Sequence, residues 1–472
     1  MVEEPSVNQQ LGIYIQVPFC QTKCTYCNFH TGVALPSAYS PYARAVEREI
    51  RNWRTFHRAA KLASVDRLDS GDAATDCHPE PRPPQNTPLL PSAVIPNPGR
   101  ISDGGEVRSR DSGGVHRTPD TGGSAFSVDT IYLGGGTPSL FDPADLSRIL
   151  DAVHSEFCSP DPAVVSSGAR AASTAASTTL EADPETITPA KAAAWLAAGI
   201  NRISLGAQSF HDAELKAAGR MHRREDILSA IACLRSEGFA NISLDLIAGL
   251  PYQTPASWRD SLDEALRLRP EHISIYLFEI DEGSRLGREL LAGGARYSAA
   301  AVPSDDAMAD SYEFACERLR QAGYDHYEIS NWALPGFRSR HNLKYWRREP
   351  YLGFGAGAHS FDGHFRWANA HDPAAYAAAI ESGRLPVEQL EEVTPKQALD
   401  EELFLGLRQL EGIDLAPIEA QYGARQQAQY NRLGERIEEL RAQGLVECDG
   451  TRVRLAPARL AVSNEVFVAL MD

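Results

Sequence analysis

The 472-residue chain lacks long apolar runs and an excess of basic charge. No stretch approaches the ~18–20 consecutive apolar residues that a membrane-spanning helix requires, although peripheral membrane contact stays compatible with the composition. The first residues, Met1–Pro5, lack the basic and then apolar character of a signal peptide, which predicts a cytoplasmic protein. The net charge is −17. Because such a surplus repels a phosphate backbone, we do not expect nucleic acid as a partner.

Cysteine is scarce and unevenly distributed. Only eight cysteines are present, and three of them stand close together near the amino end. This pattern fits a reducing compartment with a metal site better than a disulfide framework. The other five cysteines stand singly, at Cys77, Cys158, Cys233, Cys316 and Cys448.

The clustered cysteines follow a predicted strand at Leu11–Val17 in the spacing Cys-x3-Cys-x2-Cys, as Cys20, Cys24 and Cys27. Thiolates are soft ligands that suit iron–sulfur clusters. In a [4Fe-4S] cluster, three protein thiolates leave one of the four irons open to an outside ligand. The alternatives are three buried structural cysteines, or a zinc site that His30 completes.

A glycine-rich segment, Gly134-Gly135-Gly136-Thr137, follows the second predicted strand. Glycine lets backbone groups approach a ligand because no Cβ stands in the way. Such turns often serve packing alone. Here the segment follows a strand that neighbours the cysteine loop, and the combination favours a ligand site.

Strand and helix patterns alternate as in a parallel α/β sheet. In such folds functional residues gather at the carboxyl ends of the strands, and we expect every polar candidate of the core to lie at a strand end. The predicted strands are Leu11–Val17, Thr130–Leu133, Thr178–Glu181, Arg202–Gly206, Ile242–Ile247 and His272–Leu277. The predicted helices between them are Tyr42–Phe56, Pro143–Phe157, Pro189–Ala198, Arg224–Glu237 and Ser257–Leu268.

Two segments interrupt this alternation. Residues 59–127 are rich in Pro, Gly, Ser and Asp, and residues 159–177 in Ala, Ser and Thr. Both compositions predict disordered insertions, since they cannot bury enough apolar surface to offset the entropy of ordering. We therefore expect a core barrel over residues 1–393 that carries both insertions.

Residues 394–472 follow a different pattern, with helices and then a hairpin around Asp449-Gly450. Acidic residues outnumber basic ones there, which favours a structural or docking role over the reading of DNA.

The cysteine spacing, the Gly-Gly-Gly-Thr-Pro-Ser segment and the small C-terminal domain together resemble the radical S-adenosylmethionine (SAM) enzymes. Within that superfamily the chain resembles the anaerobic coproporphyrinogen III oxidase family. The resemblance implies a partial (β/α)6 TIM-like barrel, a winged-helix-like C-terminal domain, a [4Fe-4S] cluster and SAM. One departure is Gln16, which stands where the family usually has His.

The resemblance also implies a set of SAM contacts. The Gly134–Thr137 loop and Glu181 correspond to groups that meet the methionine amino group. Arg220 corresponds to the partner of the methionine carboxylate, for which a guanidinium is well shaped. Gln208 and Asp245 correspond to the ribose ligands. Any one of these residues alone would be read as an ordinary polar group.

A second motif lies at His341-Asn342-Leu343-Lys344-Tyr345-Trp346, which resembles the His-Asn-x-x-Tyr-Trp sequence of a heme-chaperone branch of the family. Imidazole is a common axial ligand of heme iron, and aromatic rings offer a flat apolar surface to a porphyrin. A lone histidine beside aromatics is otherwise more often a satisfied core residue. Two further features favour the chaperone branch over the decarboxylating oxidases. Phe29 stands where the oxidases have a further cysteine, and the 19 residues before Cys20 form a shorter N-terminal arm than theirs.

The sequence therefore predicts a cytoplasmic heme chaperone that holds heme near His341 and transfers it to an acceptor protein, as a carrier rather than an enzyme. The first alternative is an oxygen-independent coproporphyrinogen III dehydrogenase of porphyrin biosynthesis. The second is an RNA-modifying radical SAM enzyme, which the acidic charge disfavours.

Overall fold

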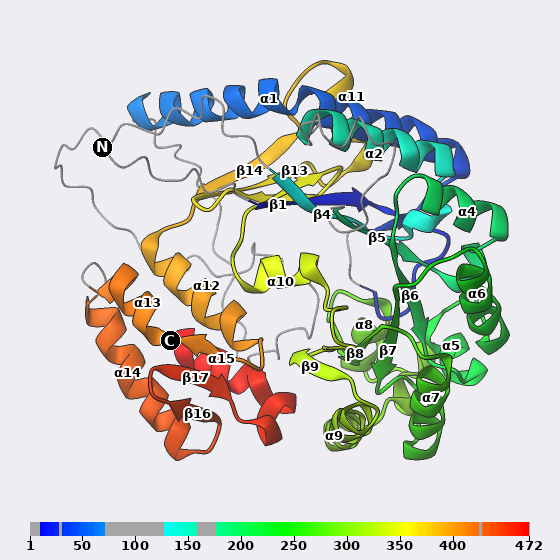
Figure 1. Ribbon diagram of the computed structural model, residues 1–472, viewed down its shortest axis with the longest axis vertical. Helices are drawn as coiled ribbons and strands as arrows, with labels where there is room; N and C mark the ends of the chain where they lie inside the picture. The colour runs from blue at the N-terminus through cyan, green and yellow to red at the C-terminus, as the bar shows by residue number, and fades with distance from the viewer. Residues whose placement is uncertain (1–9, 28–30, 71–126, 158–175, 424–426, 472) are drawn as a thin grey trace.

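A computed structural model describes residues 10–27, 31–70, 127–157, 176–423 and 427–471. Its centre is a 12-stranded sheet in the order β14-β13-β12-β11-β1-β4-β5-β6-β7-β8-β10-β9. The predicted α/β fold with a partial parallel barrel is confirmed, and the sheet curves through the molecule in Figure 1. The six predicted strands are neighbours in it: β1 (Gln10–Val17), β4 (Ser127–Gly135), β5 (Ser177–Ala182), β6 (Arg202–Gln208), β7 (Ile242–Ala248) and β8 (His272–Leu277).

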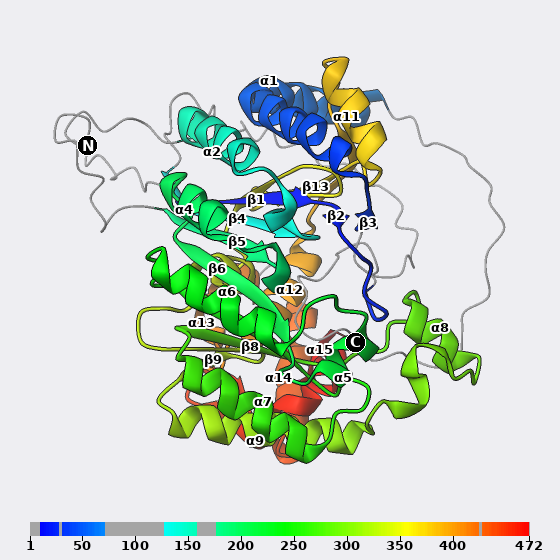
Figure 2. The ribbon, with the colours of Figure 1, turned by 90° about the vertical axis from the view of Figure 1, so that its right-hand side faces the viewer.

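Helices cover the outer face of this sheet (Figures 1 and 2). The longer ones turn an apolar stripe toward the core, in which strand residues such as Ile13, Ile131 and Leu244 have no exposed surface. The helix starts are set locally: Thr254 accepts a hydrogen bond from Ser257 N at the start of α7, as an N-cap does. The helices are α1 (Tyr39–Ser70), α2 (Pro143–Phe157), α4 (Pro189–Ala197), α5 (Asp212–Ala218), α6 (Arg224–Ser236), α7 (Pro255–Leu268), α8 (Arg285–Leu291) and α9 (Asp305–Gln321).

Strands that the sequence did not predict extend the sheet at both edges. β11 pairs parallel with β1, and the outer strands pair antiparallel. They are β9 (Asp325–Glu328), β10 (Asn331–Ala333), β11 (Tyr351–Phe354), β12 (His359–Phe361), β13 (Phe365–Asn369) and β14 (Val387–Glu392), with α10 (Arg340–Trp346) and α11 (Pro373–Glu381) between them.

The C-terminal part combines helices with a small sheet of order β15-β17-β16. The predicted hairpin is present as β16 (Val446–Asp449) and β17 (Arg452–Leu455), which pair antiparallel. In Figure 1 this part lies beside α10 and α9, in orange and red. Its other elements are α12 (Pro395–Leu407), β15 (Ile413–Asp414), α13 (Leu415–Ile418), α14 (Gln427–Ala442), η7 (Pro457–Val462) and α15 (Ser463–Met471).

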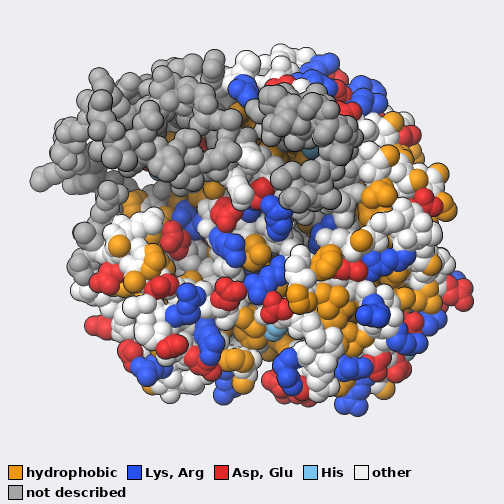
Figure 3. All heavy atoms as spheres, viewed as in Figure 1, with side chains coloured by type: hydrophobic (Ala, Val, Ile, Leu, Met, Phe, Trp, Pro, Cys, Tyr) orange, Lys and Arg blue, Asp and Glu red, His pale blue; other side chains and the backbone are white. Residues whose placement is uncertain are grey.

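The predicted insertion boundaries are wrong at three ends. Residues 59–70 belong to α1, and Ser127 already begins β4. The second insertion was predicted to end at Ser177, but that residue starts β5. Residues 71–126 of the first predicted insertion and 159–175 of the second lie outside the described residues. No helix in the described part of the chain is long and apolar enough to cross a membrane. On the face shown in Figure 3, basic and acidic side chains are interspersed.

A buried carboxyl group joins α1 to the added strands. Glu49, which is 6% exposed, accepts hydrogen bonds from Gly355 N (2.9 Å), Asn369 Nδ2 (2.7 Å) and the Tyr376 hydroxyl (2.6 Å). Burial raises the pKa of Glu49 to about 7. Three donors from three separate segments thus depend on one side chain of α1.

We predict that Glu49→Ala lowers the free energy of unfolding by about 3 kcal/mol, because it leaves three buried donors without an acceptor. Urea unfolding followed by circular dichroism measures the change. The control is Glu47→Ala on the same helix, where an ion pair with Arg51 (3.1 Å) lies at the surface and contributes less than about 1 kcal/mol. Equal losses in both variants would contradict the role given to Glu49.

Candidate functional site

The cysteine loop begins where β1 leaves the sheet. Cys20 ends the short strand β2 (Phe19–Cys20), which pairs parallel with β3 (Gly32–Val33). Between them the chain turns, with Cys27 N donating to Cys24 O at 3.3 Å. Figure 2 shows this loop reaching from the sheet toward α5 and α8. Thr25 fixes it there, because its N–H donates to Ala218 O (3.1 Å) and its carbonyl accepts from Leu286 N (3.0 Å).

The thiols of this loop lie in different surroundings. Burial raises the pKa of Cys20 to about 11, so this thiol ionises near neutral pH only with a cation or metal beside it. Arg220 lies beside a different cysteine of the loop, with its Nη1 3.6 Å from Cys24 Sγ. Within the described ranges no three His, Cys, Asp or Glu side chains gather around a position for one metal ion. Three thiols are a donor set that iron–sulfur clusters take, and His30, which would complete the zinc alternative, lies outside the described residues.

The glycine segment continues β4 and remains hydrogen-bonded to the cysteine strand. Gly136 N donates to Val17 O (2.7 Å) and Thr137 N to Phe19 O (2.7 Å). A Cβ on Gly136 would stand 2.4 Å from Phe19 O, which is closer than any side chain allows. The Gly134–Thr137 loop and Cys20 are therefore side by side, as the sequence predicted.

Glu181 lies next to this loop. Its carboxylate accepts from Gly135 N (2.9 Å) and from the Tyr132 hydroxyl (2.9 Å). Burial raises its pKa to about 7. Gln16, where the family usually has His, packs on Gly135: a Cβ there would lie 2.4 Å from Gln16 Nε2.

Arg220 is held by a residue that the sequence analysis missed. Its Nη2 donates to Asp183 Oδ1 (2.5 Å) and to Gly206 O (2.8 Å), and its side chain is 11% exposed. Asp183 also accepts from Thr137 Oγ1 at 3.1 Å. The spacing of Asp183 from Glu181 was a usable signal, because residues two apart leave a strand on the same side.

Gln208 and Asp245, the expected ribose ligands, lie on the next two strands. Gln208 ends β6 with a positive φ of 65°, a conformation uncommon for a residue with a Cβ. Asp245 lies within β7 and not at its end, so the expectation that every polar candidate of the core ends a strand is wrong here. It accepts from the Ser204 hydroxyl at 3.0 Å, and burial raises its pKa.

His341 is apart from these residues, on α10. Its Nδ1 is 2.9 Å from Thr130 Oγ1, and its Nε2 is 2.9 Å from the Tyr345 hydroxyl. The side chain is buried, and burial lowers its pKa to about 3. Both ring nitrogens are thus occupied, and the conformation described here does not present either of them to a heme iron. The ring stacks on Tyr132 at 5.1 Å, and the Tyr132 hydroxyl reaches Glu181.

The neutral state of His341 makes stability depend on pH. Its folded pKa of about 3 lies below the unfolded value of ~6.5, so the unfolded chain binds a proton in this window that the folded chain does not. The stabilisation is complete above pH ~6.5 and is lost as the pH falls toward 3. We predict that His341→Gln reduces the slope of unfolding free energy between pH 4 and 6 by up to about 1.4 kcal/mol per pH unit.

Chemical denaturation at several pH values measures that slope. His364→Gln, at an exposed position, is the matched control and should leave it unchanged. A His341→Gln slope equal to that of the unaltered protein would show that the imidazole is protonated in the folded state.

Comparison with protein families places two models on the chain. The Radical SAM superfamily matches residues 120–265, and the HemN C-terminal domain matches residues 393–458. Among solved structures, the coproporphyrinogen III oxidase HemN of Escherichia coli, described as a radical SAM enzyme, covers 98% of this chain and 90% of its own with a TM-score of 0.70. At 20% identity this likeness concerns the fold.

Relatives of similar length include three proteins from distant organisms. The heme chaperone HemW of Mycobacterium tuberculosis is 30% identical over 99% of this chain and 96% of its own. HemW of Bacillus subtilis is 28% identical over 97% and 98%, respectively. The mitochondrial radical S-adenosyl methionine domain-containing protein 1 of Bos taurus is 32% identical over 98% and 88%.

Proposed function

The chain belongs to the HemW family of heme chaperones, and we propose that it binds heme and passes it to an acceptor protein. The observation that carries this proposal is similarity to HemW proteins along the whole chain, through both the barrel and the C-terminal part.

We propose that Cys20, Cys24 and Cys27 hold a [4Fe-4S] cluster. A cluster with three protein thiolates supplies one iron that an outside ligand can take. The chain's own part is to bring the three thiols together on a loop fixed by Thr25, and to place the Arg220 guanidinium beside Cys24.

Each of Cys20→Ser, Cys24→Ser and Cys27→Ser is predicted to remove the broad iron–sulfur absorbance of anaerobically prepared protein, since a hydroxyl is a poor ligand for iron in such clusters. Cys448→Ser is the control, because that side chain lies on β16 in the C-terminal part. Iron and sulfide are quantified on the same samples. Stoichiometric zinc without sulfide would overturn this proposal.

We propose that SAM binds along the neighbouring strand ends. The Gly134–Thr137 loop and Glu181 would meet its amino group, and Arg220 its carboxylate. Gln208 and Asp245 would bind the ribose. The support is their shared position around the cysteine loop, where carboxylates and a guanidinium offer both signs of charge to a zwitterion.

Heme ligation by His341 is a proposal with a structural condition. The imidazole must first leave Thr130 or Tyr345, so we propose that α10 shifts when heme binds. We also propose a cytoplasmic location, supported by six cysteines in the described part of the chain that form no disulfide.

The decisive test separates a carrier from a decarboxylase. Protein reconstituted with its cluster is incubated with SAM, a reductant and coproporphyrinogen III, and hemin is then titrated into a fresh sample. We predict hemin binding, transfer to an added apo-hemoprotein and no protoporphyrinogen. Formation of protoporphyrinogen would favour the oxidase alternative, and absence of hemin binding would reject the chaperone.

His341→Ala in the same titration tests the ligand. We predict a changed heme absorbance band, because the iron would lose an axial nitrogen. Tyr345→Phe is the matched variant: it frees Nε2 from its hydrogen-bond partner, so ligation should be retained or strengthened. An unchanged spectrum in His341→Ala would remove His341 as the heme ligand.

A further inference from the structure

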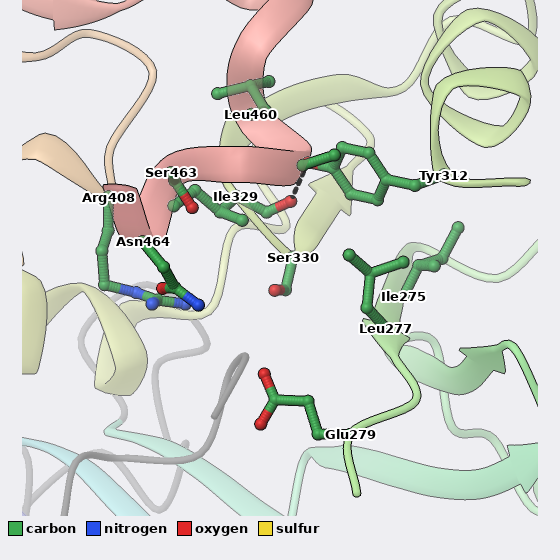
Figure 4. Close-up of a pocket in the computed structure, with 11 residues that line it drawn as sticks. Ile275, Leu277, Glu279, Tyr312, Ile329, Ser330, Arg408, Leu460, Ser463 and Asn464 are labelled. Atoms are coloured by element: carbon green, nitrogen blue, oxygen red, sulfur yellow. Dashed lines mark hydrogen bonds between the residues drawn. The ribbon is translucent and has the colours of Figure 1, made fainter. Parts of the chain in front are cut away.

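A small cavity lies where the barrel meets the C-terminal part. It is lined by the end of β8, the turn between β9 and β10, and the segment from Leu460 to Asn464 (Figure 4). Its volume is about 50 Å3. Ile275, Leu277 and Leu460 form apolar walls, and Arg408 lines it from the end of α12.

Arg408 has unused hydrogen-bonding capacity. The residue is 5% exposed, and two of its guanidinium nitrogens, Nε and Nη2, are buried without a hydrogen-bond partner among the described residues. The acidic group paired with it, Glu328, has Oε2 at 3.6 Å from Arg408 Nη2, which is too long for a hydrogen bond. Buried donors of this kind are nearly always satisfied in folded proteins, so the unsatisfied fork points to a missing partner.

Two hydroxyl groups line the same cavity. Ser330 is 2% exposed and Ser463 is 7% exposed, and both belong to the lining of the cavity. Glu279 lines the cavity from the end of β8, and Figure 4 shows its carboxylate apart from Arg408, with open space between them. A guanidinium and two hydroxyls form a donor set for a carboxylate.

The guanidinium is held in place by α10. Arg408 lies over the ring of Trp346 at 4.5 Å, a cation–π contact that fixes the plane of its N–H fork. Trp346 is the last residue of the His-Asn-x-x-Tyr-Trp motif. The motif is therefore connected to this cavity through Arg408, whereas its histidine contacts Thr130.

We propose that this cavity is a carboxylate subsite in which Arg408, Ser330 and Ser463 hold one propionate group of a bound heme. The proposal rests on the proposed function. A volume of about 50 Å3 admits a carboxylate with its methylene groups, and the tetrapyrrole ring must lie outside. Glu328 balances the charge of Arg408 while the subsite is empty.

The test compares hemin with hemin dimethyl ester, whose propionates carry no charge. Both are titrated into the full-length protein and into Arg408→Gln. We expect the unaltered protein to bind hemin about tenfold more tightly than the ester, and Arg408→Gln to lose that preference through weaker hemin binding alone. Arg366→Gln is the control: Arg366 is largely but not fully buried, is ion-paired (Glu401, 2.7 Å) and lies over an aromatic ring, but is outside the cavity.

These titrations distinguish failure of the carboxylate subsite from failure of heme binding itself. Equal affinities for hemin and the ester, or an unchanged preference in Arg408→Gln, would overturn the subsite while heme binding stands. If Arg408→Gln fails to fold, Ser463→Ala removes one donor with little change in volume and should reduce the preference severalfold.

Propionate alone provides a readout that does not require heme. Broadening of its carbon-13 carboxylate resonance by the unaltered protein, absent with Arg408→Gln, supports the carboxylate site even if hemin does not bind. In that case the carboxylate that the cavity binds belongs to a free small acid, and its assignment to a heme propionate fails. If propionate shows no broadening and the protein shows no preference for hemin over its ester, both the carboxylate site and its assignment to heme are overturned.

Discussion

The close backbone contact between the glycine loop and the cysteine strand is the constraint on which the candidate site depends. β1 and β4 are adjacent parallel strands, and their hydrogen bonding continues past the sheet through Gly136 and Thr137. Because a Cβ on Gly136 would meet Phe19 O at 2.4 Å, only glycine permits this approach. The two loops are consequently a single unit, and the neighbouring strands add Glu181, Asp183 and Arg220 to it.

Electrostatics within this unit are strongly coupled. Burial raises the pKa of Glu181 and of Cys20, while Arg220 interacts with both Asp183 and Cys24. In a partly buried environment each charge is screened less than at the surface, so a ligand that takes one partner changes the others. A bound zwitterion would place its positive end near the carboxylates of this unit and its negative end near the Arg220 guanidinium.

The short helix α10 connects regions that are distant in the sequence. His341 contacts Thr130 and stacks on Tyr132, whose hydroxyl reaches Glu181 beside the glycine loop. At the other end of the helix, Trp346 supports Arg408 at the junction with the C-terminal part. A movement of α10 would therefore change the contacts near the glycine loop and those of Arg408, since both are packed against this helix or hydrogen-bonded to it.

The sequence by itself determined the features that arise from local pattern. Six strands, the cysteine spacing and the glycine loop follow from periodicity and residue type over a few positions, and they lie where they were predicted. The length of α1, the added strands β9–β14 and the surroundings of Asp183 and Arg408 were not predicted. They depend on partners that are far apart in the chain, as Glu49 is from Tyr376. Only the tertiary structure brings such partners together, because burial decides which polar groups must be paired.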